Sequence, residues 1–169
     1  ASCVTLKAVN CDMDITVKSG IDGRVTNTGA QHFTDGEKRF YDGKYMQYVP
    51  KTTESGITFV QTTVNEFSIN GERLEVPAQI HMELRKLYGA YSFSLNKGDV
   101  LTIEKYCSVY TTRDADMKEL TVPEIQTEAL RALKELAVFG YQNLADETAE
   151  AWKEQVWDEV PITIKGSDM

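Results

Sequence analysis

Acidic residues are the side chains in this sequence that could most readily do chemistry. Two close pairs stand out, Asp114 with Asp116 and Asp146 with Glu147. A pair of carboxyl groups can cleave a glycosidic bond when a cleft holds them about 5–9 Å apart. Both pairs fall in polar segments typical of a loop or an exposed helix face, where water separates the charges. We therefore assign no catalytic residue, and a stand-alone hydrolase built on Asp114 and Asp116 is kept only as the last alternative.

The histidines and cysteines do not have the spacing of a metal site. His32 lies in a polar turn and His81 at the end of a strand-like run, and Cys3, Cys11 and Cys107 include no Cys-x-x-Cys pair. We expect no bound metal and no cofactor. Three cysteines are an odd number, which favours reduced thiols and a cytoplasmic location over a disulfide framework. Cys107 lies in a strand-like run and is predicted to be a small core residue.

Aromatic residues offer a second kind of site. Tyr41 and Tyr45 cluster with Phe40 in one strand-and-loop segment. Exposed aromatic rings can act as platforms for sugars, so Tyr41 and Tyr45 are the candidate sugar contacts. Packing of the same rings beneath a loop is the alternative interpretation.

The composition limits the possible partners. The chain has 169 residues, of which 41% are hydrophobic and 26% charged, with a net charge of -8. This is the composition of one folded domain, and its negative charge argues against nucleic acid and against an anionic membrane surface. No apolar run approaches the ~20 residues that a membrane helix needs, and no secretory signal is visible at Ala1.

The elements that must position these residues are strands over residues 1–114. Apolar residues alternate with polar ones, which indicates strands with one buried face. Gly20 is predicted to break the chain, and Asn70-Gly71 and residues 96–99 are each predicted to close a hairpin. Several strands without intervening helices indicate a mainly β fold, an antiparallel β-sandwich. The later strands are predicted at residues 44–49, 56–67, 74–81, 90–95 and 100–111.

Residues 115–160 change to a helical pattern. Thr121 and Pro123 predict a helix start and Gly140 its end, and a second helix is predicted to run toward Pro161. The apolar stripe predicts that Leu133, Trp152 and Trp157 are structural anchors against the sandwich. Residues 161–169 are predicted to hold a short final strand.

Two stretches carry a resemblance to a known family. Residues 19–27 read Ser-Gly-Ile-Asp-Gly-Arg-Val-Thr-Asn, and residues 103–114 read Ile-Glu-Lys-Tyr-Cys-Ser-Val-Tyr-Thr-Thr-Arg-Asp. With the Ala/Leu-rich helix and the two tryptophans that follow, the chain resembles glycoside hydrolase family 65 from about residue 5 to 168. The resemblance implies a mutarotase-like supersandwich, linker helices, and a catalytic (α/α)6 barrel whose residues are absent from this chain.

The resemblance also implies how the parent enzyme works. It would cleave an α-glucosidic disaccharide with inversion, using inorganic phosphate as co-substrate if it is a phosphorylase. The earliest strands are expected upstream of Ala1, and the barrel, the partner of this region, downstream of Met169. We expect the chain alone to be a non-catalytic support region. An independent carbohydrate-binding module and a structural or assembly domain, including a homodimer through unpaired strand edges, are the alternatives.

Overall fold

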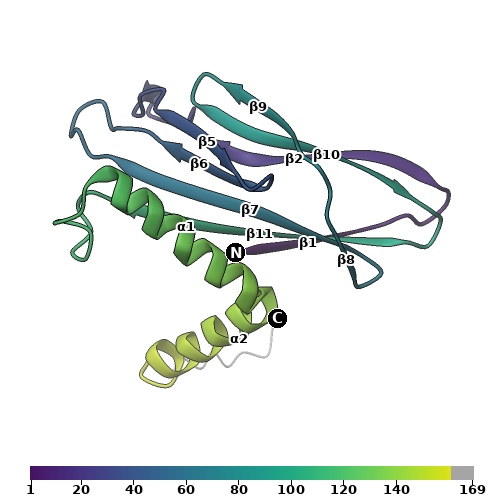
Figure 1. The fold of residues 1–169 in the computed structure, drawn as a ribbon. Coiled ribbons are helices and arrows are strands. Elements are labelled where there is room, and N and C mark those ends of the chain that lie inside the picture. The colour runs from purple at the N-terminus through teal and green to yellow at the C-terminus, as the bar shows by residue number, and fades with distance from the viewer. Residues whose placement is uncertain (161–169) are drawn as a thin grey trace.

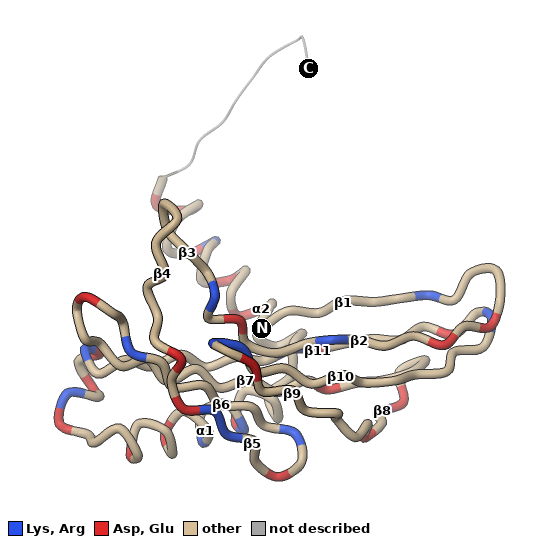
Figure 2. Tube along the Cα trace, turned by 90° about the horizontal axis from the view of Figure 1, so that it is seen from above, with Lys and Arg blue, Asp and Glu red and all other residues tan. Residues whose placement is uncertain are grey.

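Two antiparallel sheets stacked face to face form the body of the molecule (Figure 1). The computed structural model describes residues 1–160. The larger sheet has the strand order β1-β11-β7-β6-β5, with β8 paired to β7, and the smaller has the order β2-β10-β9. A separate hairpin, β3–β4, projects from this body (Figure 2). The strands are β1 (Ser2–Lys7), β2 (Met13–Asp22), β3 (Thr26–Asn27), β4 (Ala30–Gln31), β5 (Glu37–Tyr41), β6 (Tyr45–Val49), β7 (Phe59–Ile69), β8 (Glu72–Leu74), β9 (Gln79–Glu83), β10 (Lys86–Leu95) and β11 (Val100–Thr111).

An apolar core fills the space between the two sheets. Phe67 and Leu101 from the larger sheet meet Tyr91 and Phe93 from the smaller one. The ring of Phe67 lies 4.7 Å from that of Tyr91 and 5.1 Å from that of Phe93, measured between centroids. Side chains from both inner faces interdigitate in this way in a β-sandwich. The mainly β, antiparallel sandwich predicted from the sequence is confirmed.

Helix α1 (Val122–Phe139) covers the other face of the larger sheet (Figure 1). Its fully buried residues include Leu133, and the backbone oxygen of Ala129 accepts a hydrogen bond from Ser108 Oγ at 2.8 Å. The fully buried Gln47 donates from Nε2 to the backbone oxygen of Gln126 at 2.9 Å. The larger sheet is therefore buried on both faces, which explains why all five residues of β6 are buried and do not alternate.

The two ends of α1 follow the predicted signals. The backbone N–H of Thr121 donates to Glu124 Oε2 at 2.7 Å, which satisfies a group at the helix start, and Pro123 lies in the first turn. Gly140 ends the helix with φ +90°. Helix α2 (Tyr141–Trp152) and the π-helical turn η1 (Lys153–Trp157) then leave the sheet, and neither contains a buried residue (Figure 1). The predicted strand over 161–169 lies outside the described residues.

Gly20 does not break the chain as predicted. β2 runs through it, and Gly20 pairs with Tyr88 of β10. A Cβ atom at Gly20 would lie 2.1 Å from the backbone oxygen of Leu87. Glycine is required here because the two strands approach closely, and not because the chain turns.

One predicted hairpin is confirmed and the other is wrong. Asn70 and Gly71 join β7 to β8 with φ values of 52° and 86°, as a tight primed turn requires. Residues 96–99 instead carry the chain between sheets, because β10 pairs with β2 and β9 whereas β11 pairs with β1 and β7. The strand predicted over 74–81 is likewise divided between β8 and β9, which belong to different sheets.

Within residues 1–160, no helix is long and apolar enough to cross a membrane.

Candidate functional site

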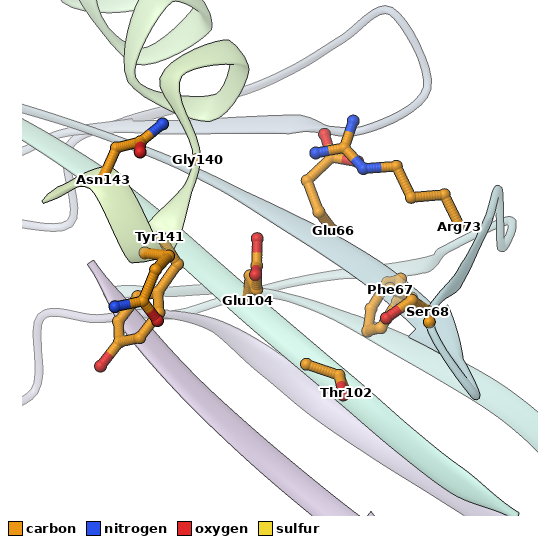
Figure 3. A pocket seen from close by; sticks show the side chains of 11 residues that line it. Glu66, Phe67, Ser68, Arg73, Thr102, Glu104, Gly140, Tyr141 and Asn143 are labelled. Carbon is orange, nitrogen blue, oxygen red and sulfur yellow. The ribbon is translucent and has the colours of Figure 1, made fainter. Parts of the chain in front are cut away.

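A polar groove lies between the β7–β8 hairpin, β11 and the start of α2 (Figure 3). We call it the elbow groove, because it lies where α1 turns into α2. Its volume is about 290 Å³. Its side chains come mainly from the helix-covered face of the larger sheet, beyond the end of α1. Its lining includes Glu66, Arg73, Glu104 and Tyr141.

Two carboxylates face each other across the floor of the groove. Glu66 of β7 and Glu104 of β11 are directly paired in the antiparallel register. Residues opposite one another in such a pair have Cβ atoms about 4.5–5.5 Å apart, and like charges in that position are unfavourable. Each carboxylate therefore needs a partner of its own, and the structure provides one for each.

Tyr106 is the partner of Glu104. Its hydroxyl donates to Glu104 Oε2 at 2.5 Å, and both residues lie on the face of β11 that α1 covers. Burial and then the neighbouring Glu104 carboxylate raise the pKa of Tyr106, so the phenol stays protonated and continues to donate. The fully buried ring packs with Leu133 of α1 in one apolar cluster.

Lys44 is the partner of Glu66. Lys44 Nζ lies 3.2 Å from Glu66 Oε1 in a partly exposed ion pair. Burial disfavours the charged amine, but Glu66 and the neighbouring Tyr45 together outweigh it, and the pKa of Lys44 is raised. Arg73 of β8 lines the same groove and forms no ion pair with the described part of the chain.

A second hollow adjoins the elbow groove on the side of α1. Its volume is about 240 Å³, and it shares Glu66 and Arg73 with the first. Its wall contains Tyr45, whose ring lies 5.3 Å from Lys44 Nζ and 5.0 Å from Lys134 Nζ. These cations stack on the ring and hold it in place.

The two tyrosines predicted to contact sugar do not form an exposed platform. Tyr45 is 8% exposed and its ring packs against α1, which agrees with the packing alternative, although α1 covers the ring where a loop was expected. Tyr41 is half-buried beside it, and its hydroxyl donates to Gln47 Oε1 at 3.2 Å. Arg39 Nη1 donates in turn to the Tyr41 hydroxyl at 3.3 Å. The aromatic segment stabilises the contact between α1 and the sheet.

The acidic pairs found in the sequence have local structural partners. Asp114 accepts hydrogen bonds from the backbone N–H of Thr111 at 2.7 Å and from its hydroxyl at 2.8 Å, which closes the turn after β11. Asp116 is exposed beyond it. Asp146 accepts from Gln142 Nε2 at 2.8 Å along the exposed face of α2. These contacts are those of turns and helix faces.

Histidine and cysteine side chains are dispersed over the structure. His81 stacks on the Tyr88 ring at 4.7 Å, and His32 Nε2 is buried without a hydrogen-bond partner in the described structure. In residues 1–160 no three of the His, Cys, Asp and Glu side chains gather as a metal site would require. All three cysteines are free thiols, but Cys107 is exposed, so its predicted place in the core is wrong.

Only one of the three predicted anchors is buried in this chain. Leu133 of α1 is fully buried, whereas Trp152 is 55% and Trp157 57% exposed. The prediction that both tryptophans pack against the sandwich is wrong, because α2 turns away from the sheet after Gly140 (Figure 1). Their indole rings lie on a part of the molecule that no other described element covers.

The elbow groove was not predicted from the sequence. Glu66 and Glu104 are separated by 38 positions, and only the register of β7 against β11 brings them together. The turn at Asn70-Gly71 folds β8 back along β7 and so brings Arg73 to the same groove. This turn was the one feature of the groove that the sequence predicted. Chemically, the carboxylates and the guanidinium can accept and donate hydrogen bonds to a polar ligand.

Comparison with known proteins shows similarity to a glycosyl hydrolase family and to two kojibiose phosphorylases. The family model for the glycosyl hydrolase family 65 N-terminal domain matches residues 1–155. The kojibiose phosphorylase of Halothermothrix orenii is 34% identical over 163 residues, which are 95% of this chain and 21% of that protein. The kojibiose phosphorylase of Escherichia coli is 24% identical over 165 residues, which are 98% of this chain and 21% of that protein.

A solved structure from the human microbiome, named for a kojibiose phosphorylase, has the same fold. The TM-score is 0.73 at 17% sequence identity, and the match covers 98% of this chain and 20% of the other. The chain thus spans about a fifth of the length of the curated relatives it matches.

Proposed function

Because this chain belongs to glycosyl hydrolase family 65 as its N-terminal domain, we propose that it is the non-catalytic support domain of a disaccharide phosphorylase. The parent reaction is cleavage of an α-glucosidic bond, as in kojibiose, with inorganic phosphate as co-substrate. Inverting attack by phosphate yields β-glucose 1-phosphate and glucose. Two relatives named for kojibiose phosphorolysis support this choice of substrate.

The observation that carries the support role is the contrast between the two helices. α1 is fixed to the sheet through Leu133 and the other buried residues of its inner face, whereas α2 and η1 hold Trp152 and Trp157 away from it. Two half-exposed indoles on adjoining turns are typical of a surface that another domain covers. We propose that the catalytic domain is this partner and that it packs against α2 and η1.

A chimera tests the proposal directly. The matching segment of the Halothermothrix orenii kojibiose phosphorylase is replaced by this chain, and release of glucose 1-phosphate from kojibiose and phosphate is measured. We expect an active chimera and no activity from the 169-residue chain alone. A folded chimera without phosphorolysis would contradict the support role, and cleavage of kojibiose by the isolated chain would contradict its non-catalytic nature.

Two properties of the parent accompany this proposal. We place the protein in the cytoplasm, which the free thiols of Cys3, Cys11 and Cys107 support. We also propose a homodimer, because β1 and β2 are edge strands of the sheets described for residues 1–160 and Val4 of β1 is 52% exposed. Light scattering of the purified chain distinguishes a dimer from a monomer.

A further inference from the structure

We propose that the elbow groove and its adjoining hollow form a binding site for a neutral disaccharide, with one sugar ring in each. The choice of sugar rests on the proposed function, whereas the site itself rests on the geometry of the groove. Glu66 and Arg73 line both hollows and would hold the hydroxyl groups on either side of the glycosidic linkage.

The size of the two hollows fits a ligand of this kind. Their volumes are about 290 and 240 Å³, and they meet at the side chains of Glu66 and Arg73. Pockets for small molecules usually measure about 300–1,000 Å³, so either hollow alone is at or below the lower end of this range. Together they provide room for two linked rings.

The polar groups of the floor match sugar hydroxyls. Glu66 and Glu104 each use one carboxylate oxygen on Lys44 and Tyr106 respectively, which leaves the other oxygen as an acceptor. Arg73 adds donors on the Glu66 side of the groove, as Figure 3 shows. Hydroxyl groups both donate and accept, so a polyhydroxy ligand can satisfy carboxylates and a guanidinium together.

The charge balance selects a neutral ligand over an anion. The two hollows contain the carboxylates of Glu66, Glu75 and Glu104, and against them the cations of Arg73, Lys44 and Lys134. The paired Glu66 and Glu104 at the floor repel phosphate groups, so phosphate or a sugar phosphate is disfavoured there. Tyr141 forms part of the wall on the α2 side and offers an aromatic surface to a sugar ring.

An NMR titration of the 169-residue chain tests this site. Kojibiose, glucose and inorganic phosphate are each added to ¹⁵N-labelled protein. We expect kojibiose to shift the amide signals of Gly71, Tyr141 and Asn143 with a millimolar Kd, glucose to bind more weakly, and phosphate to leave them unchanged. Unchanged signals at about 50 mM kojibiose, where a millimolar site would be saturated, would overturn the proposal.

Three variants test whether kojibiose binds in the groove. Glu66→Gln and Arg73→Gln each remove a charged hydrogen-bonding group and should raise the Kd for kojibiose about tenfold. Glu54→Gln is the matched control, since Glu54 is exposed in a loop outside the groove, and its Kd should not change. An unchanged Kd in both groove variants would place the sugar elsewhere and overturn the proposal.

The experiments distinguish a wrong binding site from a wrong proposed function. An active chimera together with no sugar binding by the chain would remove the groove site alone. Sugar binding together with a folded but inactive chimera would remove the support role alone. Circular dichroism and a thermal melt of each variant ensure that a loss of binding is measured on folded protein, and Arg73→Gln, at an exposed position, provides a variant that should fold.

Discussion

The Tyr106 hydroxyl donates a hydrogen bond to Glu104 Oε2 at 2.5 Å, and the two residues lie two positions apart on the same face of β11. The ring of Tyr106 packs with Leu133 of α1 and with Tyr141 at the start of α2. One side chain thus connects the sheet, the end of α1 and the turn into α2.

Tyr106→Phe should destabilise the chain by about 1–2 kcal/mol, because the ring still fills its site but Glu104 loses a partly buried hydrogen-bond donor. Urea unfolding followed by circular dichroism measures the change. Tyr110→Phe is the matched control on the same strand face, and it should cost less because the Tyr110 ring is only partly buried. Equal losses in the two variants would show that the hydroxyl of Tyr106 contributes no specific contact.

Leu133→Ala should destabilise this chain much more than Trp152→Ala. Leu133 is fully buried, so its truncation should cost about 2–5 kcal/mol. Trp152 is 55% exposed, so its truncation should change the stability of the isolated chain by less than about 1 kcal/mol. Thermal melts of the two variants decide the matter, and a large loss in Trp152→Ala would show that α2 packs back on the sandwich.

The same Trp152→Ala substitution in the chimera should behave differently. If the catalytic domain covers α2, removal of the indole should lower the melting temperature of the chimera although it leaves the isolated chain unchanged. Trp157→Ala should act in the same direction, since Trp157 is also more than half exposed. An unaffected chimera would place the catalytic domain on another surface of the sandwich.

Local signals in the sequence predicted local structure well. The turn at Asn70-Gly71 and the start of α1 at Thr121 depend on residues within a few positions of each other, and the structure confirms both. The alternation of apolar residues likewise predicted the sandwich class. Leu133 lies in the core because the helical spacing that places it on the apolar face is itself local.

Features that depend on pairing across the fold were not predictable. Gly20 was interpreted as a turn residue because the approach of β10 to β2 is invisible in the sequence. For Tyr45 the sequence left sugar contact and packing as alternatives, because nothing nearby shows that α1 covers the ring. The elbow groove depends on the register between Glu66 and Glu104, which an alternating pattern leaves open.

Gly20→Ala tests the close approach of β2 and β10. The added methyl group would meet the backbone oxygen of Leu87, which cannot move without disturbing the strand pair, so we expect a loss of about 1–3 kcal/mol. Chemical denaturation provides the measurement. Thr16→Ala, at an exposed position of the same strand, is the control, and its loss of stability should be only a few tenths of the loss in Gly20→Ala. Unchanged stability in Gly20→Ala would mean that the strands separate more easily than the packing indicates.

Stability at high pH should depend on Tyr48. The side chain is fully buried, and its hydroxyl donates to the backbone oxygen of Thr34 at 2.9 Å. Burial, followed by the nearby carboxylate of Asp35, raises the pKa of Tyr48 to about 12. The unfolded chain releases this proton near the ordinary pKa of 10, so the folded state binds more protons between about pH 10 and pH 12. The neutral phenol therefore contributes its full share to the free energy of unfolding below pH 10. This contribution is lost as the pH rises through 12.

Tyr48→Phe should remove part of this alkaline sensitivity. Phenylalanine cannot ionise, so the loss of unfolding free energy between pH 9 and pH 12 should be smaller in the variant, although the variant is less stable at pH 7 for want of the hydrogen bond to Thr34. Urea unfolding at several pH values measures both effects. Tyr106, Tyr91 and Tyr110 also have raised pKa values and remain in both proteins, so the difference between the two curves isolates Tyr48. Parallel curves over this range would show that Tyr48 ionises as easily in the folded chain as in the unfolded one.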